Sequence, residues 1–404
     1  MAAPEIAISD LPAFPYEGMT GLDTFEVFAG LREHDPVLPV RVPSGGRVFL
    51  VARYEDVRRV FSDPVFSRVA LQREDATVLI PASKIPGTML NMDPPDHTRV
   101  RKLITRAFTT GAVERMRPRV QRFTDDLIDA MVAQGAPVDF VSSFATVLPA
   151  TVISDMLGVP VRDRHRLYEW LEVVLSAGGH PREEIEGALT ALQVYLAGLI
   201  AAKRGAPADD LLSALIAARD EADKLSEPEL LSALFLLIAG GYETTAGQLT
   251  NSVLLLGYHH SDQLDLLRTR PELIPGAVEE LLRYVPQAWC APERLALEEV
   301  ELSGVRIPAG ATVVPLVYAA NRDAALLEDP ERLDVSRSRY VPHLAFGHGI
   351  HRCIGAPLAR LELQVAFATL LHRLPALRPA VSQSQLTWKL GTVTVGPRSL
   401  PVTW

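Results

Sequence analysis

The residues best suited to do chemistry lie between Phe346 and Gly355, where the chain reads Phe-Gly-His-Gly-Ile-His-Arg-Cys-Ile-Gly. Three glycines and one cysteine, Cys353, within ten residues predict a loop that brings bare backbone close to a sulfur atom. A run of helix-forming residues follows at once from Ala356. Because helix N-termini and backbone N–H groups stabilise anions, this loop is suited to hold a thiolate.

Cys353 allows three interpretations. Glycine lets a flat group lie against the backbone, which suits a thiolate ligand of haem iron. A lone cysteine beside a turn is more often a small buried apolar residue. A zinc site could combine Cys353 with His348 and His351, but no fourth ligand lies at the usual spacing nearby. The ordered pattern of the whole loop favours the haem ligand.

The pattern Phe-Gly-x-Gly-x-His-x-Cys-x-Gly resembles the haem loop of the cytochromes P-450, and every fixed position is filled. The resemblance covers most of the chain. It implies a haem-thiolate monooxygenase with haem b as cofactor, in which Cys353 is the iron ligand. Phe346, Gly347, His351 and Gly355 then become residues that contact the haem. The implied fold is mainly helical, with a small β portion and a long central helix over the haem.

A second candidate cluster occupies residues 239–245, Ala-Gly-Gly-Tyr-Glu-Thr-Thr, in the middle of a predicted long helix. Gly240 and Gly241 each cost a helix roughly 1 kcal/mol against alanine, so some gain must offset them. Their missing side chains let a ligand lie against the helix, where Glu243 and Thr244 offer a carboxyl and a hydroxyl group. The run resembles the oxygen-activation motif of the same family, in which the acid and the threonine help deliver protons. Alternatively, the threonine bonds back to its helix and the acid is merely solvated.

Cationic side chains that could hold the two haem propionates occur in three further segments. His97 and Arg101 are four residues apart, so they share a face of the helix that we expect to begin with Asp93 as N-cap. This segment resembles the propionate-binding helix of the family, and Arg294 and His351 match two further propionate contacts. Each residue taken alone could be an ordinary surface charge.

Glu280 and Arg283 stand at positions i and i+3 of a predicted helix. Taken alone they are weak evidence, because such pairs are common on solvated helix faces. In this chain they resemble the Glu-x-x-Arg element of the family, with Arg337 as the third member. We interpret the three residues as a structural network that locks the lobe carrying the cysteine loop.

The elements that position these residues are mainly helical. Residues 37–52 alternate around Ser44-Gly45-Gly46 and predict a hairpin, and Ser226 with Glu229 forms a capping box for a helix that could reach Tyr258. We expect a single domain over residues 1–404, helical except for three β-rich parts. These parts lie at about 37–68, 295–317 and 386–404.

The resemblance also suggests which residues line a substrate cavity. They come from the irregular loop 69–92, the 166–182 region, the segment after Tyr284 and the C-terminal tail. Most are apolar, which predicts a largely hydrophobic ligand, although each could equally belong to the core. The candidates are Leu79, Met89, Leu90, Trp170, Ala288, Trp289 and Leu390.

The composition limits the classes of binding partner and the cellular compartment that we expect. The net charge of −9 argues against nucleic-acid binding. The chain has two cysteines, so a metal-bound Cys353 leaves none for an intramolecular disulfide, which fits the cytoplasm. No run approaches the ~18–20 apolar residues of a membrane span, so we expect a soluble protein without membrane contact. We also expect a monomer.

Electrons must come from outside, because no second motif for flavin or an iron–sulfur cluster is evident. The resemblance implies that they pass from NAD(P)H through a ferredoxin reductase and a ferredoxin. Cations flanking the cysteine side are candidates for the docking face, although they could instead serve propionates and solvent. These cations are Arg99, Arg101, Lys102, Arg106, Arg352 and Arg360.

Three functions remain open from the sequence. The first is hydroxylation or epoxidation of a small natural product of secondary metabolism. The second is oxidative C–C or C–N coupling of an aromatic substrate without oxygen insertion. The third is a non-catalytic haem protein, against which the intact Glu243 and Thr244 argue.

Overall fold

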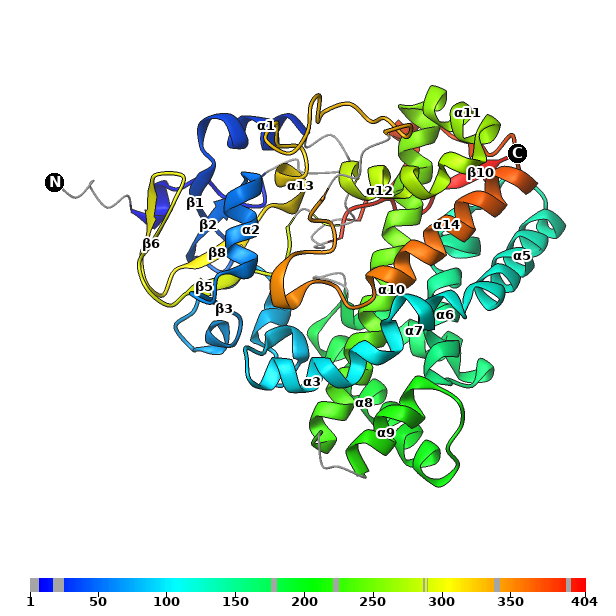
Figure 1. The fold of residues 1–404 in the computed structure, drawn as a ribbon, viewed down its shortest axis with the longest axis horizontal. Helices are drawn as coiled ribbons and strands as arrows, with labels where there is room; N and C mark the ends of the chain where they lie inside the picture. The colour runs from blue at the N-terminus through cyan, green and yellow to red at the C-terminus, as the bar shows by residue number, and fades with distance from the viewer. Residues whose placement is uncertain are drawn as a thin grey trace.

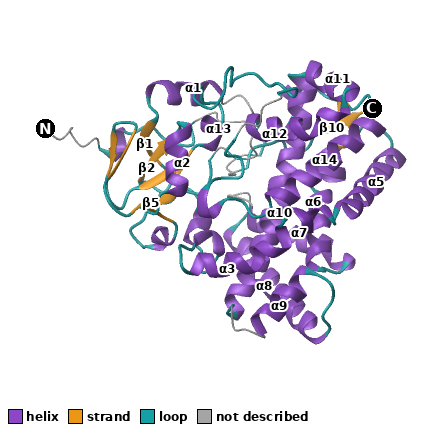
Figure 2. Ribbon diagram, viewed as in Figure 1, coloured by secondary structure: helices purple, strands orange, loops and turns teal. Residues whose placement is uncertain are grey.

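The computed structural model of the chain describes residues 7–16, 25–175, 180–220, 225–285, 288, 290–337, 342–389 and 394–404. Helices make up most of the molecule, most of the strands lie at the left of the view, and a further strand lies at the right beside the C-terminus (Figure 1 and Figure 2). The predicted division into a helical body and a small β portion is therefore confirmed.

The largest sheet contains five strands in the order β1-β2-β8-β5-β3. Their bounds are β1 Val37–Arg41, β2 Arg47–Val51, β3 Phe66–Ser67, β5 Arg294–Ala296 and β8 Thr312–Pro315. The predicted hairpin is β1 with β2, in which Val37 pairs with Val51 and Arg41 with Arg47. β8 lies parallel to β2, and β5 lies antiparallel to both β8 and β3. The sheet thereby joins the N-terminal part of the chain to the segment that carries Arg294.

Two smaller sheets complete the β portion. One has the order β4-β10-β9, and the other is the hairpin of β6 with β7. Their bounds are β4 Val138–Asp139, β6 Val300–Leu302, β7 Val305–Ile307, β9 Arg378–Pro379 and β10 Pro401–Thr403. The short strands expected within 295–317 are present as β5 to β8. In the expected C-terminal part, β10 is the strand among the described residues, and isolated bridges join Trp388 to Pro397 and Thr394 to Ala288.

Fourteen α-helices are found in the described parts of the chain. In the first half they are α1 Phe25–His34, α2 Tyr54–Ser62, α3 Asp96–Thr105, α4 Thr110–Glu114, α5 Arg117–Gln134, α6 Val147–Leu157 and α7 Val161–Leu175. In the second half they are α8 Arg182–Gly205, α9 Leu211–Asp220, α10 Glu227–Tyr258, α11 Ser261–Thr269, α12 Ile274–Tyr284, α13 Val317–Ala320 and α14 Ala356–Arg373. The main hydrophobic core lies among these helices, and a second cluster lies between the large sheet and α2.

The long helix α10 begins as the sequence predicts. The Ser226 hydroxyl accepts the Glu229 N–H at 3.3 Å, and the Glu229 carboxylate accepts the Ser226 N–H at 2.7 Å. The helix has 32 residues and crosses the middle of the helical body (Figure 1). Its second half is buried on nearly all sides, so tertiary packing stabilises it more than its own propensity does.

The expected N-cap at Asp93 is wrong. Helix α3 begins at Asp96, and Pro95 occupies the cap position without a side-chain hydrogen bond. The Asp93 carboxylate instead accepts the Arg68 N–H at 3.0 Å and the Ser67 hydroxyl. Donors at the end of β3 therefore compete successfully with the helix terminus for this carboxylate.

The expectation that no segment approaches the dimensions of a membrane span is also wrong by length and composition. Helices α8 and α10 are long and apolar enough to cross a membrane. In the structure α10 runs through the protein interior, and α8 packs against α7, α9 and α10. Their apolar character is used, at least in part, for packing inside this fold.

Candidate functional site

The cysteine loop is held by its own backbone and by glycines that no other residue could replace without strain. Gly347 and Gly349 both have φ of +66°, and a Cβ on Gly349 would lie 2.5 Å from the Phe61 carbonyl oxygen. The Cys353 N–H donates to the Phe346 carbonyl at 2.8 Å, which closes the loop. Helix α14 begins three residues later, as the sequence predicts. The sulfur is thus placed by backbone geometry.

Opposing influences act on the Cys353 thiol. Burial among protein atoms raises its pKa, although one side of the residue is exposed. The Gly355 and Ala356 N–H groups and the charges of Arg101 and Arg352 act in the opposite direction without reversing the shift. The predicted stabilisation by the helix N-terminus is therefore present but insufficient alone, and a bound metal cation would favour the thiolate further.

Two buried imidazoles lie beside the loop. His97 of α3 and His351 have ring centroids 4.2 Å apart. Both His97 ring nitrogens and Nε2 of His351 are buried without a hydrogen-bond partner in the described part of the chain. Burial, followed by neighbouring positive charge, lowers the pKa of His97 to about 4 and that of His351 to about 2. Unsatisfied buried nitrogens are costly, so these positions are suited to an acceptor that the protein itself does not provide.

Two guanidinium groups act on the same imidazoles. Arg294, at the start of β5, and Arg101 of α3 both lower the pKa of His97 and of His351 through their charge. Arg294 is buried and donates to the Pro292 carbonyl at 2.7 Å. Arg101 donates to the Arg352 carbonyl in the cysteine loop. The structure therefore gathers all four predicted propionate contacts into one cluster, in which the two guanidinium groups supply positive charge and the imidazoles supply unpaired ring nitrogens, a setting that suits buried carboxylates.

The sequence left two interpretations open for Glu243 and Thr244 at the centre of α10, and the structure bears on each of them. The Thr244 hydroxyl donates back to the Gly240 carbonyl at 2.7 Å, as in the purely structural alternative. Glu243, however, is not merely solvated, because its Oε1 accepts the Thr394 hydroxyl at 2.7 Å. A Cβ on Gly240 would meet nothing within 4 Å, whereas one on Gly241 would approach Ile153 at 3.1 Å. Packing thus accounts for Gly241, and Gly240 borders open space in which a ligand can approach the helix.

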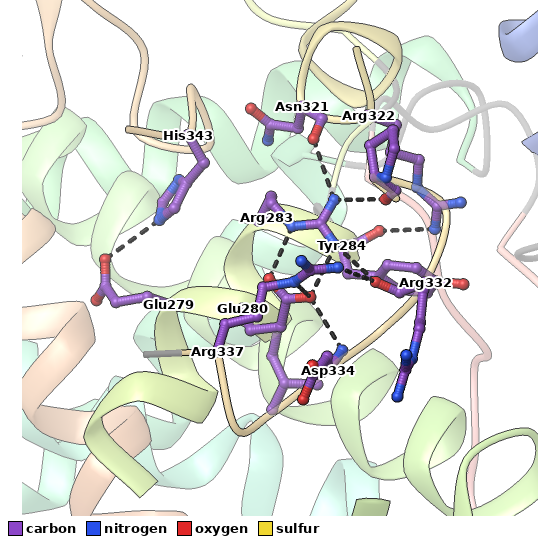
Figure 3. Close-up of polar contacts among 12 residues, drawn as sticks. Glu279, Glu280, Arg283, Tyr284, Asn321, Arg322, Arg332, Asp334, Arg337 and His343 are labelled. Carbon is purple, nitrogen blue, oxygen red and sulfur yellow. Dashed lines mark hydrogen bonds and ion pairs between the residues drawn. The ribbon is translucent and has the colours of Figure 1, made fainter. Parts of the chain in front are cut away.

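Glu280, Arg283 and Arg337 form one buried network, shown in Figure 3. The Arg283 guanidinium donates to both Glu280 oxygens at 2.7 and 2.8 Å, and Arg337 Nε donates to Glu280 at 3.0 Å. Arg283 also donates to the carbonyl groups of Asn321, Pro330 and Arg332. The network ties α12 to the segment that precedes the cysteine loop.

The sequence analysis missed Glu279, the neighbour of Glu280. Its carboxylate accepts the Arg360 guanidinium at 2.7 and 2.8 Å and contacts His343 Nε2 at 3.2 Å (Figure 3 shows the His343 contact). Burial acts to raise the pKa of Glu279, but His343 and Arg360 outweigh it and lower the pKa to about 2. This ion pair links α12 directly to α14, and nothing local in the sequence indicates it.

The candidate substrate residues are dispersed. Met89 is buried in a short turn, Met89–Asn91, that contacts α10, while Leu79 and Leu90 are partly buried. Ala288 is bridged to Thr394 near Glu243. Trp170 lies between α7 and α8, where its ring is 6.0 Å from that of Tyr195. Trp289 and Leu390 lie outside the described residues.

The zinc alternative finds no support. Among the described residues, no three histidine, cysteine, aspartate or glutamate side chains are grouped to hold a metal ion. Cys290 is buried and, like Cys353, free of disulfide bonds. Among the described residues, neither His348 nor His351 is therefore grouped with Cys353 as a zinc site would require.

A sequence model of the cytochrome P-450 family matches residues 161–385 of the chain. Over 398 residues, which cover 98% of this chain and 99% of the relative, the chain is 46% identical to the nocardicin C N-oxygenase of Nocardia uniformis subsp. tsuyamanensis. The chain belongs to the cytochrome P-450 family.

Solved structures of other cytochromes P-450 share the whole fold. The LnmA hydroxylase from the leinamycin biosynthetic pathway of Streptomyces atroolivaceus is 46% identical, with a TM-score of 0.90 and coverage of 98% of this chain and 100% of that one. Cytochrome P-450mel, described as having biaryl coupling reactivity, is 39% identical, with a TM-score of 0.87 and coverage of 94% and 96%. These likenesses confirm the fold that the sequence predicts.

As a cytochrome P-450, the protein is an oxidoreductase that uses haem b and electrons from redox partners. The residues present fit that cofactor. The unsatisfied nitrogens of His97 and His351 beside Arg101 and Arg294 match the propionates, and the Cys353 sulfur beside two backbone N–H groups matches the iron.

Proposed function

We propose that this cytochrome P-450 hydroxylates or epoxidises a small, largely hydrophobic natural product of secondary metabolism. The observation that carries the proposal is the combination of the Cys353 loop with Glu243, Thr244 and the open side of Gly240. When bound, haem supplies the activation of dioxygen. Relatives named as an N-oxygenase and a hydroxylase support oxygen insertion into a biosynthetic product.

In this proposal the chain's own residues have five tasks. Cys353 would hold the iron, and the cluster of His97, Arg101, Arg294 and His351 would hold the propionates. Gly240 leaves room for substrate and small molecules against α10. Thr244 and Glu243 hold and move the protons that the reaction consumes. Phe346, Gly347 and Gly355 would shape the surfaces that lie against the haem.

The substrate is proposed to be apolar because the candidate lining residues are apolar. Ala288 is the best-supported contact, since it is bridged to Thr394, whose hydroxyl donates to Glu243 at the centre of α10, and Met89 lies on a turn that contacts the same helix. Titration of the haem absorbance against a panel of apolar and charged natural products tests this. Tighter binding of charged compounds would contradict it.

Oxidative coupling is a second candidate, because one structural relative is described as having biaryl coupling reactivity. Product mass separates the two reactions: oxygen insertion adds one oxygen atom, and coupling removes two hydrogen atoms without adding oxygen. Consumption of dioxygen in step with either product would exclude a non-catalytic haem protein.

Replacing Thr244 by alanine should divert electrons from product to hydrogen peroxide, because the hydroxyl that donates to Gly240 is also the one placed to relay a proton. We expect the peroxide fraction to rise several-fold and the carbon monoxide difference spectrum to persist. Thr250→Ala is the matched control, since Thr250 makes the same back-bond to Ala246 at 2.9 Å. Equal peroxide yields in the two variants would contradict the relay role.

We also propose a ferredoxin with its NAD(P)H-dependent reductase as the electron source. Of the candidate docking cations, Arg360 pairs with Glu279, and Arg99 pairs with Glu229 and Asp96. Lys102, Arg106 and Arg352 are exposed and, in the described part of the chain, take part in no salt bridge. These three are therefore the stronger candidates.

The double substitution Lys102→Glu, Arg106→Glu should slow reduction by the ferredoxin about tenfold at low salt, with less effect at high salt, because screening weakens such steering. Arg182→Glu, an exposed cation of α8 outside the candidate docking set, is the control. Stopped-flow reduction measures the rate. An unchanged rate at low salt would remove these residues from the docking face.

We further propose that the chain is one domain, monomeric and cytoplasmic. Limited proteolysis, sedimentation and cell fractionation check the three points. Two stable fragments, a dimer or a membrane-bound fraction would contradict the respective point.

A further inference from the structure

Glu243 is held from outside its own helix by a C-terminal hairpin, in which residues 387–389 pair with 396–398. The Lys389 N–H donates to the Gly396 carbonyl at 3.0 Å, and the Arg398 N–H donates to the Thr387 carbonyl at 2.7 Å. From this hairpin the Thr394 hydroxyl donates to Glu243 Oε1 at 2.7 Å. The Lys389 ammonium lies 4.0 Å from the same oxygen.

The hairpin is itself anchored on α10. The buried Asn251 side chain donates to the Val395 carbonyl at 2.8 Å. Asn251 and Glu243 are eight residues apart, so they lie on the same face of the helix. Gly396 has a φ of +152°, and a Cβ there would lie 2.9 Å from Asn251 Oδ1. The hairpin therefore approaches α10 as closely as glycine allows, and this contact sets the position of Thr394.

The two oxygens of Glu243 are consequently in different surroundings. Both hairpin contacts end on Oε1, and Oε2 has no hydrogen-bond or ion-pair partner among the residues that the structure describes. The neighbouring Thr244 hydroxyl is directed to the Gly240 carbonyl, and adjacent residues of a helix do not face each other. Without the hairpin, rotation of the carboxyl group would interchange its two oxygens.

We propose that Thr394 and Lys389 are positioning residues that hold Oε1 and leave Oε2 as the oxygen through which Glu243 exchanges protons. Oε2 takes a proton from water and releases it toward the Thr244 side, so Glu243 returns to its starting protonation state. The inference rests on the proposed function of Glu243. It adds two residues, lying about 150 positions away in the chain, to the machinery that delivers protons.

The first experiment compares isosteric with conservative changes in the haem-loaded enzyme at saturating substrate. Thr394→Val keeps the volume but removes the donor, and Lys389→Met removes the charge. We expect each to raise the fraction of electrons lost as peroxide several-fold, while the carbon monoxide difference spectrum is retained. Thr394→Ser and Lys389→Arg should restore wild-type coupling, because they keep the hydroxyl and the charge.

The second experiment does not depend on turnover. Hydrogen–deuterium exchange of the peptides that contain residues 387–389 and 396–398 reports how firmly the hairpin is held. Glu243→Ala should speed this exchange several-fold, and Thr250→Ala, on the same helix, should leave it unchanged. Unchanged exchange in Glu243→Ala would show that the contacts of Thr394 and Lys389 with Glu243 do not hold the hairpin on α10, and would overturn the proposal.

The possible results distinguish a failure of the positioning role from a failure of the proposed monooxygenase function. Wild-type coupling in Thr394→Val, or a Thr394→Ser variant as uncoupled as Thr394→Val, overturns the positioning role while the monooxygenase assignment stands. A wild-type enzyme that makes no dioxygen-dependent product with any substrate it binds overturns the proposed function, and the role of Glu243 with it.

Discussion

Replacing Cys353 by serine abolishes the carbon monoxide difference spectrum that marks thiolate-ligated haem. A serine hydroxyl stays protonated at neutral pH, so the Gly355 and Ala356 N–H groups that can stabilise a thiolate have no anion to bind. The loop itself should be retained, since its closing bond runs from the backbone N–H at this position to the Phe346 carbonyl. Haem content and the spectrum of the reduced protein under carbon monoxide measure the effect.

Cys290→Ala is the matched control for this substitution. Cys290 is the other cysteine of the chain, and burial raises the pKa of its thiol far above the usual value, so it should remain a neutral apolar group. The spectrum of this variant should equal that of the wild type. A thiolate spectrum that survives in Cys353→Ser, or disappears in Cys290→Ala, would refute the ligand assignment.

Replacing Arg283 by alanine lowers the free energy of unfolding by about 3–5 kcal/mol, the usual cost of removing one partner from a buried ion pair. Arg283 is fully buried, and its loss leaves Glu280 without its bidentate partner and the Asn321 and Pro330 carbonyl groups without this donor, while the Arg332 carbonyl keeps its bond from Arg337. Urea denaturation followed by far-ultraviolet circular dichroism measures the loss. The lobe that carries the cysteine loop should also release haem more readily.

An exposed ion pair provides the control. Arg182 and Glu186 are paired at 2.7 Å on α8, but their side chains are 91% and 61% exposed. Arg182→Ala should therefore change stability by less than about 1 kcal/mol. If Arg283→Ala lowered the free energy of unfolding by no more than Arg182→Ala does, the network would not stabilise the fold as proposed.

The network also has a predictable pH dependence. Burial acts to raise the pKa of Glu280. The hydrogen bonds and charge of Arg283 outweigh burial, together with hydrogen bonds from the Asp334 backbone N–H and the Arg337 side chain, and leave the pKa below its ordinary value of 4.5. A lowered folded-state pKa means that this stabilisation is complete above pH 4.5 and is lost as the pH falls through the lowered value. The stability difference between wild type and Glu280→Gln should therefore shrink on acidification. A difference that stayed constant with pH would contradict the ionised network.

Local chemistry accounts for what the sequence determined by itself. The left-handed glycines and closing bond of the cysteine loop, the Ser226–Glu229 capping box and the Glu280–Arg283 pair involve residues within a few positions of one another. Such features follow from backbone sterics and helix spacing, which do not depend on the rest of the fold. The capping box predicted the start of the long helix, while the family and the expected iron ligand followed from the resemblance of the cysteine loop to that of the cytochromes P-450.

Tertiary structure alone decided which distant groups meet. Asp93 binds donors at the end of β3 instead of capping α3, Arg360 is paired with Glu279 across two helices, and Glu243 binds a threonine from the C-terminal hairpin. Each partner is one of many chemically equivalent side chains in the sequence. The choice among them depends on which elements pack together, because a hydrogen bond or ion pair requires its two groups within a few ångströms.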